Sequence, residues 1–185
     1  MEGTVVIKLG GSFLTDKSRP YSVRRKELQD VSDVIARKAK SVAIVHGGGS
    51  FGHPVAKKYG LSSRNLSTSG EGVSETREAM RRLNGYVVES LLAAGLKLYV
   101  LPAISLVDRL GRERRGTKDI LSTLIRSGIS PLTYGDVIPY REGFRIISGD
   151  TLSYLLCRAL NAEKMIFLID RPGVLRNRND PSSLL

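Results

Sequence analysis

The sequence has only one cysteine, Cys157, in 185 residues. A single cysteine excludes an intrachain disulfide framework and a zinc site built from cysteines. Cys157 follows Tyr154, Leu155 and Leu156, an apolar setting that predicts packing rather than catalysis. This cysteine usage is typical of a protein in a reducing compartment, and we expect a cytoplasmic location.

Long apolar runs are also lacking. A membrane-spanning helix needs about 20 consecutive, predominantly apolar residues, and no stretch of the sequence reaches that length. The N-terminus enters the β-branched residues 4–7 without the basic and apolar regions of a signal peptide. The sequence therefore predicts a soluble protein without a membrane segment.

Acidic residues are few: 18 Asp+Glu against 29 Lys+Arg give a net charge of +11. Such an excess favours anionic partners, either nucleic acid or phosphorylated metabolites. Arginines cluster at residues 24–25, 81–82 and 112–115, but no aromatic residues alternate with them as on a single-strand binding surface. We therefore interpret these clusters as solvated faces and expect no nucleic-acid partner.

Apolar runs alternate along the chain with segments whose apolar residues have helical spacing. Strands are expected at residues 4–7, 41–45, 98–101, 130–133 and 164–169. Helices are expected at residues 25–40, 72–94, 119–127 and 151–160, with a short helix opening at Pro54 and a hairpin that pairs residues 137–140 with 144–147. This alternation predicts an α/β fold with a mainly parallel sheet covered on both faces, in a single domain over residues 1–185.

Two of the first strands run directly into glycine-rich turns, at residues 8–12 (KLGGS) and 46–53 (HGGGSFGH). Ligands of open α/β sheets bind at the carboxyl ends of the strands. Glycine turns before helix N-termini allow backbone N–H groups to hold a phosphate. A tight turn without a ligand is the alternative for either loop alone, but two such loops together favour a phosphate site.

The spacing Gly47-x-Gly49-x-x-Gly52 formally matches the dinucleotide-binding fingerprint. That fingerprint also needs a second strand ending in an acidic residue about twenty residues later, whereas residues 62–69 are polar and turn-like. The G-x-x-x-x-G-K-[ST] loop of P-loop enzymes is absent. A nicotinamide enzyme is therefore a minor alternative, and any nucleotide must be held in another way.

Taken in order, several motifs resemble those of the amino acid kinase superfamily and, within it, of isopentenyl phosphate kinases. They are residues 8–12 (KLGGS), 15–17 (TDK), 46–54 (HGGGSFGHP) and 147–150 (ISGD), supported by residues 80–84 and 134–137. The resemblance covers nearly all of residues 4–175 and implies a three-layer αβα sandwich. It also implies transfer of the γ-phosphoryl group of ATP to isopentenyl phosphate, for isoprenoid synthesis, with Mg²⁺ accompanying the nucleotide.

The resemblance implies roles for particular residues. Those implied to bind the acceptor are Gly47, Gly48, Gly49, Gly52, His53, Ser148 and Gly149. Those implied to lie at the nucleotide are Lys8, Gly10, Gly11, Ser12, Lys17 and Asp170. The implied catalytic residues are Lys8, Lys17, His53 and Asp150, of which Asp150 orients Lys8 through an ion pair.

Each of these side chains also has a structural interpretation. For His53 the alternative is a capping or surface residue. For Lys17 it is a solvated loop lysine, and for Asp150 it is an N-cap for a helix beginning at Thr151. Asp150 is not expected to act as a general base, because a phosphate acceptor has no proton that requires removal. No cluster of carboxylates in the sequence indicates a metal site built by the protein itself.

The resemblance weakens toward the C-terminus. Residues 169–175 read IDRPGVL, where the family pattern is Thr-Asp-x-Asp-Gly-Val-Tyr. The family's adenine-binding segment, with its second catalytic lysine, has no counterpart before Leu185. We therefore expect a C-terminally truncated form of the fold, with an acceptor-binding portion and most of the nucleotide-binding portion absent. The alternatives to an active kinase are a non-catalytic phosphate-binding or regulatory remnant and one half of a split kinase.

A long apolar stripe runs from Val73 to Leu92 at helical spacing. By resemblance, this segment corresponds to a helix at a dimer interface. We therefore expect a homodimer through the helix at residues 73–92, and packing of the stripe inside the chain is the alternative.

Overall fold

The computed structural model describes residues 3–16, 18–63, 65–170, 173, 176–177, 180 and 182–184. A five-stranded sheet with the strand order β3-β4-β2-β1-β7 lies at its centre, and all neighbouring strands are parallel. The strands are β1 Val5–Leu9, β2 Val42–His46, β3 Leu98–Val100, β4 Ser130–Tyr134 and β7 Lys164–Leu168. The predicted mainly parallel sheet is confirmed, with boundaries within two residues of those expected.

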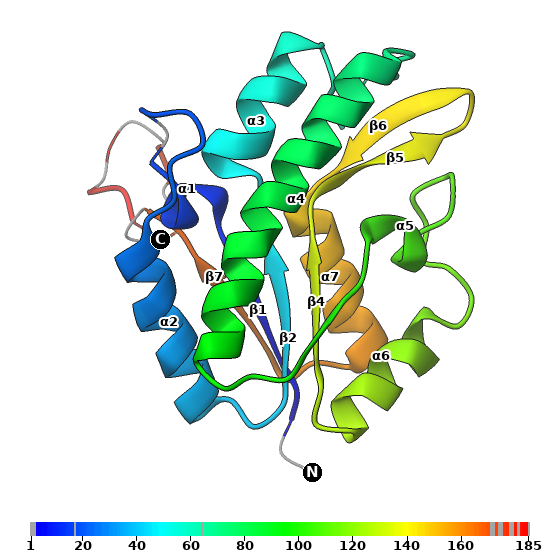
Figure 1. Cartoon of the computed structure of the whole chain (residues 1–185). Helices are drawn as coiled ribbons and strands as arrows, with labels where there is room; N and C mark the ends of the chain where they lie inside the picture. Colours follow the sequence, from blue (N-terminus) through cyan, green and yellow to red (C-terminus); the bar gives the residue numbers. More distant parts are fainter. Residues whose placement is uncertain are drawn as a thin grey trace.

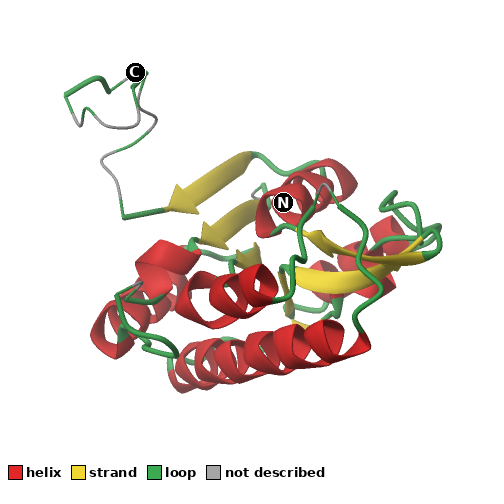
Figure 2. Cartoon of the chain, turned by 90° about the horizontal axis from the view of Figure 1, so that it is seen from above, coloured by secondary structure: helices red, strands yellow, loops and turns green. Residues whose placement is uncertain are grey.

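Helices cover both faces of the sheet (Figure 1), and the view from above shows the strands between two groups of helices (Figure 2). One face carries α2 (Arg25–Lys38) and α4 (Gly70–Ala93), and the other carries α6 (Thr117–Arg126) and α7 (Gly149–Leu160). Ile7 and Ile44 belong to the first core, whereas Val6 and Ala43 belong to the second. Successive strand residues point to opposite faces, so a strand covered on both sides must be apolar throughout. The predicted three-layer αβα architecture is confirmed.

A separate antiparallel hairpin connects the sheet to α7. It consists of β5 (Asp136–Tyr140) and β6 (Gly143–Ile147), as predicted. The chain leaves β4, passes through this hairpin and returns to the sheet at the N-terminus of α7. The hairpin thereby brings residues 147–150 back to the carboxyl ends of β1 and β2.

The helix after β2 begins earlier than predicted. α3 spans Gly49–Lys58, so Pro54 lies inside the helix rather than at its start. Proline has no backbone N–H, and the carbonyl of Ser50, four residues earlier, instead accepts a hydrogen bond from the N–H of Tyr21 (3.3 Å). The N-terminus of α3 therefore lies within the glycine loop itself. Two further single-turn helices were not predicted, α1 (Gly11–Leu14) and α5 (Ala103–Leu106).

The long helix α4 directs its apolar stripe into the chain. Its buried residues include Thr76, Met80, Leu83, Val87 and Leu91. Packing of the stripe inside the chain was the alternative to a dimer interface, and the structure has this packing. The prediction is therefore corrected: the whole stripe does not form a dimer interface. None of the described helices combines the length and the apolar composition that crossing a membrane requires.

β7 forms one edge of the sheet and pairs with β1 alone among the described strands. Its apolar residues Met165, Ile166 and Phe167 are about 40% exposed, at 38, 42 and 40% respectively. Because neighbouring side chains of a strand point to opposite faces, both faces of β7 present apolar groups to solvent. The sequence of β7 is therefore that of an interior strand, although its position is that of an edge strand.

Candidate functional site

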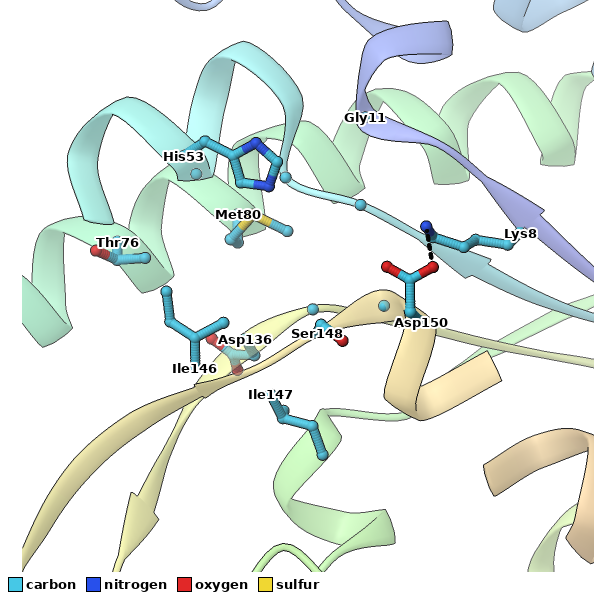
Figure 3. Close-up of a pocket in the computed structure, with 15 residues that line it drawn as sticks. Lys8, Gly11, His53, Thr76, Met80, Asp136, Ile146, Ile147, Ser148 and Asp150 are labelled. Carbon is cyan, nitrogen blue, oxygen red and sulfur yellow. Dashed lines mark hydrogen bonds and ion pairs between the residues drawn. The ribbon is translucent and has the colours of Figure 1, made fainter. Parts of the chain in front are cut away.

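A cavity of about 140 Å³ lies at the carboxyl ends of β1, β2 and β4 (Figure 3). Parallel strands end at the same edge of a sheet, and Leu9, His46 and Tyr134 are register partners across three adjacent strands. The turns that follow these residues therefore meet. The residues that line the cavity are Lys8, Gly11, Gly47, Gly48, Gly52, His53, Thr76, Met80, Gly135, Asp136, Ile146, Ile147, Ser148, Gly149 and Asp150.

The two glycine loops are in direct contact. A Cβ atom on Gly11 would lie 2.2 Å from the nitrogen of Gly49, and one on Gly47 would lie 2.9 Å from the nitrogen of Gly11. Gly49 also has a φ of +48°, a conformation that glycine adopts with little strain. Thr15 joins the loops because its hydroxyl donates to the carbonyl of Gly11 (2.6 Å) and accepts from the N–H of Ser50 (2.8 Å).

One end of the cavity is suited to an anion. The backbone N–H groups of Gly11, Gly48 and Gly149 make no hydrogen bond within the part of the chain that the structure describes, and all three residues line the cavity. Gly149 begins the twelve-residue helix α7, whose N-terminus carries partial positive charge. Unpaired N–H groups at a helix N-terminus are ready to bind a phosphate or a carboxylate.

Lys8 contributes a positive charge at this end. Its side chain is 12% exposed, and Nζ lies 2.7 Å from Oδ1 of Asp150. The Asp150 side chain is 66% exposed, so this ion pair is open to solvent on the carboxylate side. The expected contact between Asp150 and Lys8 is thus present. The N-cap interpretation of Asp150 is wrong, because the hydroxyl of Ser148 accepts from the N–H of Thr151 (3.1 Å) and caps α7.

His53 reaches the cavity from the first turns of α3, where its residue is exposed. A Cβ atom on Gly48 would lie 3.2 Å from its ring carbon Cδ2, so the imidazole lies close against the glycine turn. Figure 3 shows His53 and Lys8 approaching the cavity from different elements, with Asp150 opposite Lys8. The helical position of His53 excludes the interpretation that it caps the helix from outside.

The other end of the cavity is apolar. Met80 and Ile147 are buried at 3% and 4% exposure, and Ile146 is partly buried. The sulfur of Met80 lies 2.4 Å from the position that a Cβ atom on Gly52 would occupy, so glycine at this position is what allows Met80 to reach the cavity. The cavity therefore has a polar end formed by glycine N–H groups and a lysine, and an apolar wall from α4 and β6.

An ion pair involves one of the cavity residues, Asp136. Asp136 is 3% exposed, and one of its carboxylate oxygens lies 3.2 Å from Nε of Arg77. The other oxygen accepts a hydrogen bond from the N–H of Val137 (2.8 Å). Burial raises the pKa of Asp136, and Arg77 partly opposes that rise. The pair fixes the start of β5 against α4.

The structure brings most of the predicted site residues together. The acceptor residues Gly47, Gly48, Gly52, His53, Ser148 and Gly149 all line the cavity, and so do Lys8, Gly11 and Asp150. Gly49 instead packs on Thr15 beneath the loop.

The residues predicted at the nucleotide are less concentrated. Gly10 donates its N–H to the carbonyl of Leu168 (2.8 Å), and neither Gly10 nor Ser12 lines the cavity. Asp170 is exposed beyond the end of β7. Lys17 lies outside the described residues.

Six cavity residues were not predicted: Thr76, Met80, Gly135, Asp136, Ile146 and Ile147. Met80, Gly135 and Asp136 belong to stretches that supported the resemblance, but no role was inferred for them. The apolar residues have the periodicity of core positions, so nothing in the sequence distinguishes a residue that lines a cavity from one that fills a core. The described residues contain no group of three or more His, Cys, Asp or Glu side chains that could hold a metal ion.

Parallel strands ending in two touching glycine loops beside a lysine define a phosphate-handling α/β domain, and comparison with known proteins identifies the family. The model of the amino acid kinase family matches residues 3–185. The chain belongs to this family.

Several relatives are isopentenyl phosphate kinases. That of Methanocaldococcus jannaschii is 33% identical, with 92% of this chain and 70% of the relative covered. That of Haloferax volcanii is 37% identical, with 92% and 71% covered. An acetylglutamate kinase of Prochlorococcus marinus is 29% identical over 98% of this chain and 64% of the relative. Most of this chain is thus matched, whereas about a third of each relative lies outside the match.

Solved structures agree with the sequence comparison. A crystal structure of an isopentenyl phosphate kinase substrate complex superposes with a TM-score of 0.87 at 29% identity, covering 99% of this chain and 76% of that one. A product complex of the Thermoplasma acidophilum enzyme gives a TM-score of 0.85 at 28% identity, with 98% and 77% covered. The fold and the family therefore agree.

Proposed function

We propose that this chain is a kinase of the isopentenyl phosphate type, which transfers the γ-phosphoryl group of ATP to isopentenyl phosphate and produces isopentenyl diphosphate for isoprenoid synthesis. The observation that carries the proposal is the two-ended cavity. It combines glycine N–H groups and Lys8 at one end with Met80, Ile146 and Ile147 at the other. An alkyl phosphate has the same two parts, an anionic head and a short hydrocarbon chain.

In this proposal the acceptor phosphate occupies the polar end. The N–H groups of Gly48 and Gly149 hold its oxygens, and His53 donates a further hydrogen bond from α3. The N–H groups are preorganised, because the contact between the glycine loops holds the loop of Gly48, and Gly149 is fixed as the first residue of α7. Fixed donors aimed at a transferring group supply most of the acceleration in phosphoryl transfer.

Lys8 is assigned to the charge that develops between acceptor and donor. The carboxylate of Asp150, 2.7 Å away, holds Nζ at the mouth of the cavity. Asp150 has an electrostatic role, because an ionised acceptor oxygen attacks phosphorus without losing a proton. Lys17 is assigned to the terminal phosphate of the donor by resemblance alone.

The hydrocarbon chain of the acceptor is assigned to the wall formed by Met80, Ile146 and Ile147. Each buried methylene contributes about 0.8 kcal/mol, so the chain adds several such increments to phosphate binding. An acceptor with a second carboxylate, such as acetylglutamate, would place its charge against this wall. The wall therefore favours an alkyl phosphate over the acceptor named for the acetylglutamate kinase relative.

ATP is the phosphoryl donor of this proposal, and Mg²⁺ accompanies its phosphates. The amides of Gly11 and Ser12 are assigned to the donor, with Asp170 beyond β7, whereas the N–H of Gly10 is already paired with the carbonyl of Leu168 and only shapes the loop. The loop that carries Gly11 touches the loop that carries Gly49, so donor and acceptor phosphates would meet at the contact of the two loops. That arrangement suits in-line transfer between two polyanions.

The test combines binding and turnover on the purified chain. Calorimetry should show that isopentenyl phosphate binds at least about tenfold more tightly than inorganic phosphate, because two methylenes already contribute more than the 1.4 kcal/mol that corresponds to tenfold. N-Acetylglutamate should not compete. Isotope-traced transfer from ATP should yield isopentenyl diphosphate. Selective binding without transfer would instead support a phosphate-binding remnant or one half of a split kinase, and no binding by folded protein would refute the acceptor site.

We also propose that the chain forms a homodimer through the outward face of α4. Leu92 on this helix is 51% exposed, and Tyr99 on the edge strand β3 is 52% exposed. Gly85 has open space where a side chain would be, which allows a partner to approach the helix backbone closely. The apolar residues on the inward face of α4 already pack in the core, so the dimer contact must be made by the outward residues Gly85, Leu92 and Tyr99.

A further inference from the structure

His46, the last residue of β2, lies where the cavity loops meet, yet it does not line the cavity. The residue is fully buried. Its carbonyl accepts a hydrogen bond from the N–H of Gly135 (3.2 Å), and its ring stacks on Tyr134 with centroids 5.0 Å apart and an interplanar angle of 17°. His46 thus connects the turn after β2 to the turn after β4.

The imidazole has two polar contacts. Nδ1 lies 3.1 Å from the carbonyl oxygen of Gly47, and Nε2 lies 3.2 Å from the side-chain oxygen of Asn84 on α4. A carbonyl can only accept, so Nδ1 must carry the proton. A neutral imidazole then has an unprotonated Nε2, which accepts. Rotating the side-chain amide of Asn84 by a half-turn places its NH₂ group at Nε2, where it donates a hydrogen bond to the ring.

This contact fixes the peptide between Gly47 and Gly48. The described peptide bonds are all trans, so the carbonyl of Gly47 and the N–H of Gly48 point in opposite directions from the same plane. Because the carbonyl of Gly47 is held against the buried ring of His46, the N–H of Gly48 points away from that ring. That N–H makes no hydrogen bond within the described chain, and Gly48 lines the cavity.

We propose that His46 and Asn84 are positioning residues, which hold the Gly47 carbonyl so that the Gly48 N–H is preset to bind the acceptor phosphate. The proposal rests on the proposed kinase function for the identity of the ligand, but the orientation of the peptide can be tested without it. Burial lowers the pKa of His46 to about 4, which agrees with a neutral ring at physiological pH. The peptides on either side are held by backbone hydrogen bonds, from Gly47 to the Leu9 carbonyl and from Phe51 and Gly52 to the Gly48 carbonyl. The peptide between Gly47 and Gly48 has no such backbone bond, and two glycines allow it to turn over, so His46 has an orientation to select.

A matched pair of substitutions separates positioning from packing. In His46→Asn, the amide nitrogen occupies the place of Nδ1 and can still donate to Gly47. In His46→Gln, the amide reaches the place of Nε2 and contacts Asn84 instead. We expect His46→Gln to bind inorganic phosphate and isopentenyl phosphate about fivefold to tenfold more weakly than His46→Asn, the equivalent of one hydrogen bond. Equal affinities in the two variants, with melting temperatures measured on the same samples, would overturn the proposal.

A spectroscopic measurement tests the same proposal without an acceptor. Nitrogen-15 NMR of the intact chain at neutral pH should show His46 as the Nδ1–H tautomer. The Asn84→Leu variant should populate the Nε2–H tautomer in part, because Nε2 then no longer accepts a hydrogen bond and only the Gly47 carbonyl favours the Nδ1–H form. A wild-type Nε2–H tautomer would refute the positioning role, since Nδ1 could not donate to Gly47. Failure of isopentenyl phosphate to bind, with phosphate binding and the Nδ1–H tautomer retained, would refute the proposed function alone.

Discussion

The two histidines of the sequence, His46 and His53, lie in one loop region but in opposite environments. His46 is fully buried and stacked on Tyr134, whereas His53 is exposed on the first turns of α3. Burial disfavours the charged form of the ring, so His46 is suited to act as a fixed neutral hydrogen-bonding group. His53 can approach a phosphate and donate a hydrogen bond to it.

Substitution of His53 should separate acceptor recognition from stability. A histidine that donates to a phosphate makes a charge-assisted hydrogen bond worth roughly 1.5–3 kcal/mol. His53→Ala should therefore weaken isopentenyl phosphate binding by about tenfold to a hundredfold, and His53→Gln should recover part of the loss. Because His53 is exposed, the melting temperature should stay near that of the wild type. Calorimetry and thermal unfolding on the same samples check this, and lost stability with unchanged affinity would contradict it.

The free energy of unfolding should depend on pH through His46. Burial lowers its pKa in the folded chain from 6.5 to about 4. Between these values the unfolded chain binds a proton that the folded chain does not, so stability falls as the pH falls through this window. The shift corresponds to a loss of about 3 kcal/mol across it.

The matched control is His46→Phe, which keeps a ring against Tyr134 but cannot titrate. Denaturant unfolding of both proteins at intervals from pH 7 to pH 4 should show a steeper loss for the wild type. Asp136, whose folded pKa is raised by burial, contributes the opposite slope and is present in both proteins, so it cancels in the difference. Parallel pH profiles would show that His46 is not the group responsible.

At the scale of elements, α4 has two faces with different functions. Its inward face includes Leu83, which is fully buried, and its outward face includes Leu92. The inward face also supplies Met80 to the cavity and Asn84 to His46. The helix thus joins the core to the acceptor site, and the proposed dimer contact lies on its other side.

Two substitutions on α4 should have different effects. Leu92→Glu should weaken self-association, measured by sedimentation over a range of concentrations, while leaving the midpoint of unfolding of the monomer unchanged. Leu83→Ala should lower the free energy of unfolding by about 2–5 kcal/mol, because it leaves a cavity in the core. A wild-type chain that stays monomeric at high concentration would refute the dimer proposal.

At the scale of the molecule, the acceptor and donor halves of the proposed site are unequally enclosed. The acceptor cavity has walls from β1, α3, α4, β6 and α7. The donor loop lies next to β7, whose Phe167 and Ile166 are about 40% exposed, at 40 and 42%. An edge strand with apolar groups on both faces is suited to pairing with further polypeptide.

Nucleotide binding by the 185-residue chain should therefore be weak and insensitive to the base. Apart from Asp170, the contacts assigned to the donor are backbone amides and lysines, which recognise phosphates rather than adenine. ATP, GTP and inorganic triphosphate should bind with affinities within about threefold of one another, a difference of about 0.6 kcal/mol or less. Competition calorimetry in the presence of Mg²⁺ checks this. A clear preference for ATP would show that this chain encloses the base.

The sequence by itself determined the architecture and the location of the site. Continuous apolar runs ending in glycine turns, such as residues 42–49, predicted parallel strands with ligands at their carboxyl ends, and the structure has this arrangement. Local signals suffice here, because strand burial and turn chemistry depend on near neighbours. The start of α3 was predicted too late because a tertiary contact of Ser50 with Tyr21 compensates for the missing N–H of Pro54.

Only the tertiary structure decided which apolar and polar residues serve the site. Met80 and Leu83 belong to one helical stripe, yet the first lines the cavity and the second fills the core. Asn84 reaches His46 from 38 residues away in the sequence, and Ile147 reaches the cavity through the hairpin. Side-chain periodicity fixes the face of a helix that is buried, but what that face meets depends on how distant elements pack. For that reason the glycine loops could be found from the sequence, whereas the contact of His46 with Asn84 and the apolar wall of the cavity could not.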